Sequence, residues 1–458
     1  MERQKVLIQL LREILVAIAV ACIIYVLVLF VSGQQFSVSA GISFVLRACC
    51  CWWILFRVPA VLLRRWWKKR SAVREVSRVA TRFLMNRNAL FGALVLLYTS
   101  IIFTGAHLLA PDGSSHAAQQ VNELAFCPPG TEAVLFSLPH VKHTHRESFL
   151  KVLLRGRDLQ ERLIAVTDAR ADTSGVYVTR FMGDGIIGPE MSYRWEELGL
   201  LEPEDDAAAE SKLKDLLIHR TYHLGTDDLG RDYLSRLIVG VRVSFAVGFV
   251  AVFIALLIGI PVGAVAGYYQ QHPPVIHLGK RRWKLPADGF IMWTMSVVWA
   301  IPTLLLVFPV VYAFGQQFYT IFIAVGITMW VDIARVVRGQ VMQVRELEFI
   351  EATRSFGYGK MRTILLHILP NITGPVIVIT AANFAYAILT ESGLSFLGIG
   401  VQPPAPSWGL MISKYKDNLI TDPYLALLPG AAITLLVLAF FLVGNGLRDA
   451  MDIRMQES

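Results

Sequence analysis

Residues 351–370 have the sequence EATRSFGYGKMRTILLHILP, a charged, glycine-punctuated segment between two long apolar stretches. The whole chain has 458 residues, of which 55% are hydrophobic and 17% are charged. This composition is too apolar for a soluble protein of this length and predicts a polytopic membrane protein. A charged island between membrane spans needs a reason, and docking of another protein is our first hypothesis for it.

The apolar runs on both sides of this segment predict the membrane spans, because a spanning helix needs about 20 mostly apolar residues. Arg47, Arg57 and Pro59 interrupt the second run, so it is also compatible with a buried or re-entrant helix, as is the short sixth run. The runs cover residues 14–31, 42–63, 89–109, 245–268, 290–314, 318–331 with a polar continuation, 375–389 with its continuation, and 425–443.

Lysine and arginine in the short loops predict the orientation, since cytoplasmic loops carry an excess of both. Residues 64–87 are strongly basic and contain a single acidic residue, Glu75, and a second basic cluster lies at residues 280–284. Counting spans from these anchors puts both termini and residues 351–370 in the cytoplasm and residues 111–220 outside. The net charge of +8 then reflects orientation rather than nucleic-acid binding. A signal peptide at residues 14–31, cleaved near Ser39, is an alternative that leaves this topology unchanged.

Residues 111–220 lack a long apolar run and contain alternating stretches such as GVYVTR at 175–180, which predict short strands. We therefore expect a small α+β domain here. The five cysteines suggest no disulfide framework, and the histidines at 140, 143, 145 and 219 share no metal-site spacing with cysteines or carboxylates. We predict no catalytic residue, no metal site and no cofactor.

ATP hydrolysis is not expected of this chain. A phosphate-binding loop needs Gly-x4-Gly-Lys-Ser/Thr, whereas Lys280 is followed by Arg281 and Lys360 by Met361. Any ATP-driven step must therefore come from a separate protein.

The segment YHLGTDDLGRDYLSRLIVGVRVSFAVG at residues 222–248 predicts a turn followed by a helix, with Asp227 or Asp228 as the cap. It resembles the second (C-type) permease subunit of the dipeptide/oligopeptide and nickel family of ABC importers. The resemblance extends over residues 82–111 and 221–454. Matching stretches include AGYY (266–269), IPTLLL (301–306), ARVVRGQV (334–341), HILPN (367–371), ILTESGLSFLGIGVQPPAPSWGLMIS (388–413) and GLRDAMD (446–452).

The resemblance implies an all-α polytopic permease core of six helices, one from residues 82–110 and five from residues 221–458. An extra N-terminal two-helix hairpin (1–81) and the extracytoplasmic α+β insert (111–220) add to it. In the third family span, Trp293 and Ser296 stand where Arg and Asp are expected after Asp288.

The implied function is that of a non-enzymatic permease subunit in a bacterial cytoplasmic membrane. It would form half of a permease pair for peptides, with nickel, opines and glycosides as other possible solutes. The implied partners are a sister permease, two cytoplasmic ATP-binding subunits and an extracytoplasmic solute-binding protein.

Within this family, residues 346–370 correspond to the cytoplasmic loop that couples the permease to its ATPase. Two short helices with a tight turn at Gly357 would form a compact knob, because glycine tolerates positive φ. Proline favours helix starts, so Pro370 would begin the next span. Thr353 stands where alanine is commoner. The implied coupling residues are Glu351, Ala352, Thr353, Gly357, Leu369 and Pro370.

Polar residues inside spans are costly and usually functional. Asn383 and Glu391 are the predicted pathway residues, although a structural hydrogen bond would equally explain Glu391. Asp332 and Arg335 are close enough along a helix to form a pair. An alternative function is a membrane-anchored sensor or envelope assembly factor that uses residues 111–220 as a receptor.

Overall fold

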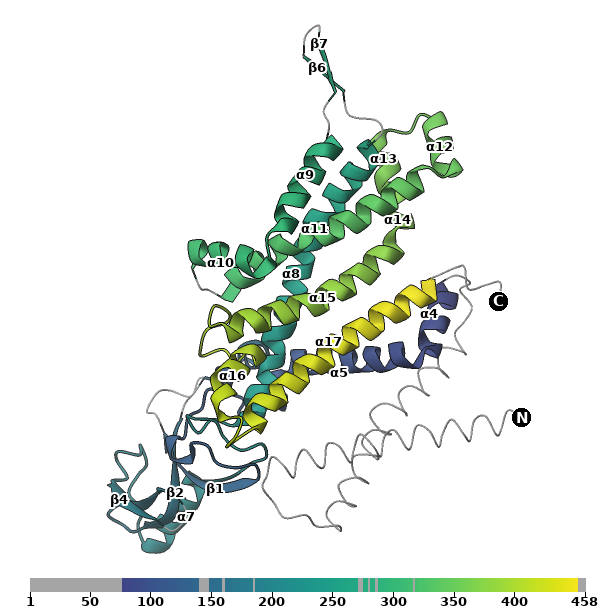
Figure 1. Cartoon of the computed structure of the whole chain (residues 1–458). Helices are drawn as coiled ribbons and strands as arrows, with labels where there is room; N and C mark the ends of the chain where they lie inside the picture. The colour runs from purple at the N-terminus through teal and green to yellow at the C-terminus, as the bar shows by residue number, and fades with distance from the viewer. Residues whose placement is uncertain are drawn as a thin grey trace, which may run out of the picture.

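The structure is a computed structural model that describes residues 76–139, 148–158, 161–183, 186–270, 275–278, 281–284, 287–315 and 318–451. Both predicted N-terminal spans, the signal-peptide alternative and the histidines at 140, 143 and 145 lie outside these residues. Figure 1 shows a bundle of long helices with a sheet domain at one end.

Five helices in the described part of the chain are long and apolar enough to cross a membrane, and a bent pair raises the number to six. A shorter helix, α4 (Val76–Met85), precedes them and packs against the last. The six spans are α5 (Arg87–Leu109), α8 (Tyr233–Tyr269), the pair α9 (Ala287–Ala300) and α10 (Thr303–Phe314), α11 (Phe318–Arg345), α15 (Thr373–Phe396) and α17 (Tyr424–Met451).

One predicted span differs in shape from the structure. Residues 290–314 do not form one helix, since α9 and α10 meet at an angle of 90°. Pro302 lies at the bend, and a proline disfavours helical geometry in the residue before it. The apolar run 318–331 and its polar continuation form one helix, α11, which extends to Arg345, as predicted.

A line of glycines brings α8 and α11 into close contact. Gly259, Gly263 and Gly267 lie four residues apart on α8, and an added Cβ at each would lie 2.4–2.8 Å from a backbone oxygen of α11. Small residues at this spacing let two membrane helices approach backbone to backbone. This pair forms the centre of the bundle core.

Between α5 and α8 the chain forms a five-stranded antiparallel sheet with the order β4-β3-β2-β1-β5. The predicted strand at 175–180 corresponds to β3, and the register pairs Val134 of β1 with Val166 of β2. The elements are β1 (Thr131–Pro139), α6 (Phe149–Arg155), β2 (Glu161–Ala171), β3 (Val176–Phe181), β4 (Ile187–Tyr193), α7 (Asp206–Leu216) and β5 (Leu217–Tyr222).

Helix α7 covers one face of this sheet and closes a separate hydrophobic core. Phe136 and Trp195 are buried there with Leu213 of the helix. The indole N–H of Trp195 donates to the Asp172 carbonyl at 3.0 Å, so its polar edge is satisfied. The insert therefore has a core of its own, independent of the membrane helices.

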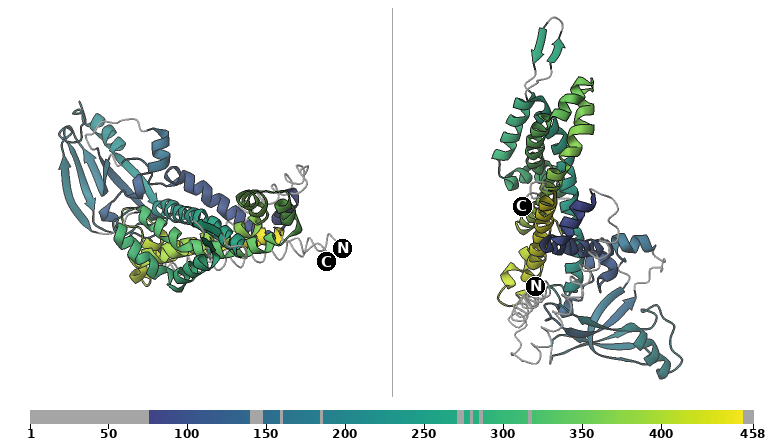
Figure 2. Two further views of the ribbon diagram at one scale, coloured as in Figure 1. Left: turned by 90° about the horizontal axis from the view of Figure 1, so that it is seen from above. Right: turned by 90° about the vertical axis from the view of Figure 1, so that its right-hand side faces the viewer.

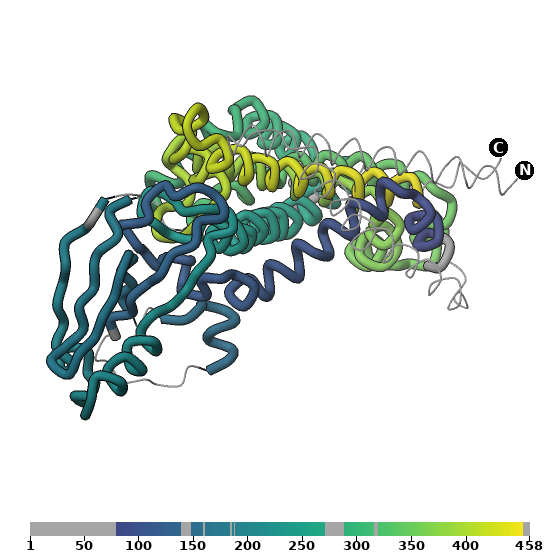
Figure 3. Tube along the Cα trace, turned by 90° about the horizontal axis from the view of Figure 1, so that it is seen from below, coloured from purple at the N-terminus to yellow at the C-terminus, as the bar shows by residue number. Residues whose placement is uncertain are grey.

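The two ends of the bundle carry different structures. Figure 2 shows the sheet domain at one end and the hairpin of β6 (Val275–Leu278) and β7 (Arg281–Lys284) at the other. In Figure 3 the sheet domain lies to one side of the bundle, and α5 runs toward it. The short helices α12 (Glu348–Ser355) and α13 (Lys360–Thr363) lie at the hairpin end.

Candidate coupling and translocation site

The segment around Gly357 is a compact knob, which we define as residues 348–371. It contains α12, α13, a π-helical turn (Ile364–Ile368) and α14 (Leu369–Asn371). At the end of α12, the Gly357 N–H donates to the Arg354 carbonyl and the Tyr358 N–H donates to the Thr353 carbonyl. This bond pair is the Schellman motif, which needs a left-handed residue at the position of Gly357. Its φ is +75°, as the predicted glycine turn requires.

One side of the knob is anchored in the bundle. Ile350, Ile364 and Ile368 are buried in the main hydrophobic core. Thr353 is also buried, and its hydroxyl donates to the Ile350 carbonyl at 2.7 Å. Thr353 therefore faces the bundle, and its hydroxyl is satisfied by a carbonyl of its own helix, α12.

The other side of the knob is exposed and carries large apolar side chains among charged ones. The Phe356 side chain is 79% exposed, and Met361, Leu365 and Leu366 are each more than half exposed. Glu351 and Ala352 lie on the exposed side as well. Sequence patterns did not single out Phe356, because its exposure depends on the turn that projects it.

Arg345, just before the knob, forms hydrogen bonds with the C-terminal end of α8. The buried Arg345 guanidinium donates to the carbonyls of Gly267 and Tyr268 at 3.3 and 2.9 Å, and it pairs with Glu346 at 2.8 Å. A cation at these carbonyls also matches the negative end of the helix dipole. Arg354 and Lys360 lie over the rings of Tyr268 and Tyr269, at 5.9 and 5.1 Å from their centroids. The AGYY segment thus supports the knob.

Replacing Arg345 with methionine should destabilise this joint by about 1–3 kcal/mol, because two buried carbonyls lose their donor. We expect a lower midpoint of thermal unfolding for the detergent-purified protein. Arg354→Met is the matched control and should cost no more than about 0.5–1 kcal/mol, since Arg354 is exposed and loses only its contact with the Tyr268 ring. Equal midpoints for the two variants would contradict the proposed role of Arg345.

Glu391 and Asn383 of α15 are buried in this structure. Neither lines the cavity beside the bend between α9 and α10 or the cavity between α11, α15 and α17. Glu391 is fully buried, and the Ser395 hydroxyl donates to its Oε1 at 2.7 Å. Ser395 Oγ in turn accepts from the Val401 N–H and the Ser407 hydroxyl. Glu391 therefore holds the connection to α16 (Trp408–Tyr415), and its pathway role stays a prediction.

Two arginines of α11 contact side chains of α9. Arg338 forms a two-bond ion pair with Asp288 at 2.7 and 2.8 Å, which joins the helices where the family resemblance had led us to expect a different polar pair. Arg335 interacts electrostatically with Asp332, as predicted for near neighbours on a helix, but forms no hydrogen bond with it, and its guanidinium lies 4.2 Å from the ring centroid of Trp299. A flat guanidinium packs well on an aromatic face, and the Trp299 ring of α9 is within reach of Arg335.

A buried ionic network joins the sheet domain to the membrane helices at the TDDLGRD segment. The Asp227 carboxylate is fully buried, accepts from the N–H groups of Leu229 and Arg231, and pairs with the Arg231 guanidinium at 2.7 Å. Arg236 of α8 lies 3.4 Å from the same carboxylate. Neither Asp227 nor Asp228 caps α8, contrary to prediction, because the turn they form places Asp232 at the cap, where it accepts from the Ser235 N–H.

Asp228 links this turn to α16. It accepts from Lys414 at 2.6 Å and from the Tyr415 hydroxyl at 2.8 Å. Burial by itself raises the pKa of Asp228, but the bonds from Lys414 and Tyr415 outweigh it, so the pKa lies below its usual value. The carboxylate is therefore charged at neutral pH, and the loop stays tied to α16.

Comparison with known proteins identifies the family. The family model described as binding-protein-dependent transport system inner membrane component matches residues 259–457. A glutathione transport system permease protein of Pectobacterium atrosepticum is 37% identical over 233 residues, covering 51% of this chain and 73% of that protein.

Two further relatives come from other bacteria. A dipeptide transport system permease protein of Alkalihalophilus pseudofirmus is 39% identical over 51% of this chain and 72% of that protein. An oligopeptide transport system permease protein of Bacillus subtilis is 36% identical over 52% of this chain and 73% of that protein. The chain therefore belongs to the peptide permease family of binding-protein-dependent ABC transporters and is a membrane-spanning permease subunit of an ABC importer.

Proposed function

We propose that this permease imports short peptides or peptide-like solutes as one half of a permease pair. The names of the glutathione, dipeptide and oligopeptide permeases among its relatives support this substrate class. The test is ATP-dependent uptake of a radiolabelled tripeptide by the complete transporter in proteoliposomes, with Ni²⁺ and a glycoside as competing solutes. Uptake of either competitor in place of the peptide would reject the peptide assignment.

The knob is the proposed docking element for a cytoplasmic ATP-binding subunit. The observation that carries this proposal is the contrast between its two sides: one is anchored by buried isoleucines and Arg345, while the other exposes Phe356. An aromatic anchor on a rigid support is typical of a residue that dominates binding energy at an interface. Movement of the ATPase would be transmitted through Arg345 to α8 and α11. Glu351, Ala352, Thr353, Gly357, Leu369 and Pro370 form or support this element.

The orientation follows from this assignment. With the knob in the cytoplasm, the sheet domain at the other end of the bundle would lie outside, where it is suited to receive a solute-binding protein. Both termini would then be cytoplasmic, and Asn383 and Glu391 would act in or near the solute pathway. Among the residues that the structure describes, no feature favours a role as sensor or assembly factor.

Replacing Phe356 with aspartate should strongly reduce co-purification of the ATP-binding subunits. A buried charge without a partner is costly, and loss of an aromatic anchor typically weakens binding by 2 kcal/mol or more, which is roughly 30-fold. Leu201→Asp is the matched control, because Leu201 is 86% exposed on the sheet domain. If the two variants retain equal amounts of ATPase, Phe356 is not a docking anchor.

A further inference from the structure

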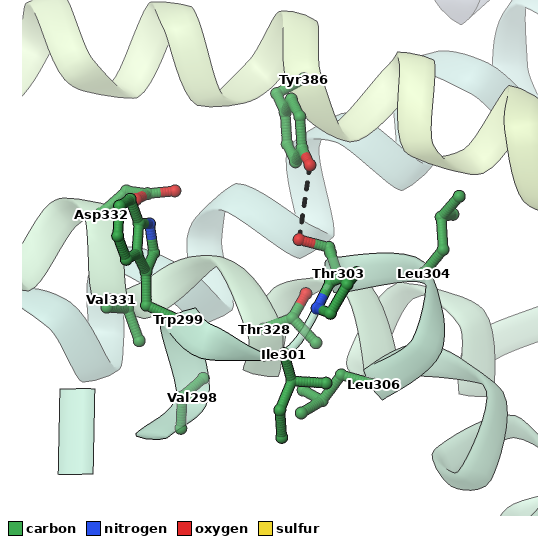
Figure 4. Close-up of a pocket in the computed structure, with 11 residues that line it drawn as sticks. Val298, Trp299, Ile301, Thr303, Leu304, Leu306, Thr328, Val331, Asp332 and Tyr386 are labelled. Carbon is green, nitrogen blue, oxygen red and sulfur yellow. Dashed lines mark hydrogen bonds between the residues drawn. The ribbon is translucent and has the colours of Figure 1, made fainter. Parts of the chain in front are cut away.

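A cavity of about 480 Å³ lies beside the bend between α9 and α10, with further walls from α11 and α15. Figure 4 shows Asp332 and Tyr386 on opposite helices above Trp299 and Thr303. The cavity is open on one side, since Trp299 is 63% and Tyr386 is 45% exposed. Its volume lies within the range of small-molecule sites.

Asp332 is the single carboxylate among the residues that line this cavity. It lies close to the middle of α11 and is half-buried. Within the described part of the chain, its carboxylate forms no hydrogen bond and no ion pair, and the charge that acts on it is that of Arg335, one helical turn away. Arg335 donates no bond to Asp332 and lies over Trp299, while Arg338 pairs with Asp288. A charged group at membrane depth normally has a partner or serves a function.

The other polar groups of the cavity suit a hydrogen-bond donor. The Tyr386 hydroxyl donates to Thr303 Oγ1 at 3.4 Å, which leaves the lone pairs of the tyrosine oxygen available to accept. An ammonium group has three donors and no acceptor, so a carboxylate with nearby hydroxyl oxygens satisfies it. A divalent metal prefers several oxygen ligands, and one carboxylate does not supply them.

We propose that this cavity binds the protonated amino group of the solute during its passage, with Asp332 as the counter-charge. The inference rests on the proposed import of peptides, whose free amino terminus is such a group. Asp332 would favour solutes with an amino terminus over neutral or blocked ones of the same size.

The first test compares uptake of trialanine and N-acetyl-trialanine by the complete transporter in proteoliposomes, with the same solute-binding protein throughout. Asp332→Asn keeps the size of the side chain and removes its charge. We expect the ratio of kcat/KM for trialanine to that for the acetylated peptide to fall roughly tenfold, the effect of one charged hydrogen bond. An unchanged ratio overturns the proposal, whether both rates fall together or neither falls.

The second test does not depend on the identity of the solute. Thr328→Cys places a thiol in the cavity one helical turn from Asp332, in a background with the five native cysteines replaced by serine. We expect 2-aminoethyl methanethiosulfonate, a cation, to label this thiol faster than the anionic 2-sulfonatoethyl reagent, and Asp332→Asn to abolish the preference. Equal labelling rates with Asp332 present overturn the ammonium site. Failure of wild-type peptide uptake alone rejects only the peptide substrate.

Discussion

Replacing Gly357 with valine is expected to lower ATP-driven solute uptake about tenfold, while the protein still inserts into the membrane and the complex still hydrolyses ATP. The φ of +75° at this position strains any β-branched residue, at a cost of about 1–3 kcal/mol. The Schellman turn would relax, and α13 would change its direction relative to α12. The measurement is uptake and ATP hydrolysis in the same proteoliposomes.

Gly359→Val provides the matched control two residues away. Gly359 has a φ of −66°, which L residues adopt readily, and an added Cβ there would meet no atom within 4 Å. Both variants add the same side chain to the same exposed connection, so a difference between them isolates the backbone turn. Undiminished uptake with Gly357→Val would show that the turn does not transmit the movement.

The apolar runs predicted which segments cross the membrane but not their shapes. Hydropathy carries no information on direction, so the right-angle bend at Pro302 was missed although the proline was visible. For α11 the apolar run 318–331 was predicted to continue through polar residues, but hydropathy did not show where the helix ends. Those residues are accommodated by neighbours, Arg338 by Asp288 and Arg335 by Trp299, which come from a segment some 40 residues away.

The same limit applies to the knob and its support. Gly357 was predictable, because a positive φ leaves a local signature in the sequence. Arg345 was not, because its acceptors are backbone carbonyls of α8, which any sequence provides. The line of glycines on α8 was visible in the sequence, but its partner surface on α11 begins some 70 residues later. Local signals predict turns, whereas tertiary partners decide which side chains matter.

The junction of the sheet domain and the membrane helices should be the most sensitive point for stability. Asp227→Ala would remove the carboxylate that lies 3.4 Å from the buried Arg236 and would leave the buried Arg231 with only its longer contact to Asp228, at 3.7 Å. Removing one partner of a buried ion pair typically costs about 3–5 kcal/mol, because the remaining charge stays desolvated. We expect a marked fall in the midpoint of thermal unfolding of the detergent-purified protein, or loss of the folded protein.

Two further variants separate the charge from the turn. Asp228→Ala is the control at the neighbouring position, where the side chain is 27% exposed, and its effect should be smaller because water can reach Lys414 and Arg231 keeps its pair with Asp227. Asp227→Asn keeps an oxygen that can accept from the N–H groups of Leu229 and Arg231 but loses the charge. If the asparagine variant is as unstable as the alanine variant, the charge dominates. If it is as stable as wild type, the backbone bonds suffice and the ion pairs contribute little. An alanine variant at 227 no less stable than that at 228 would contradict the central place of Asp227.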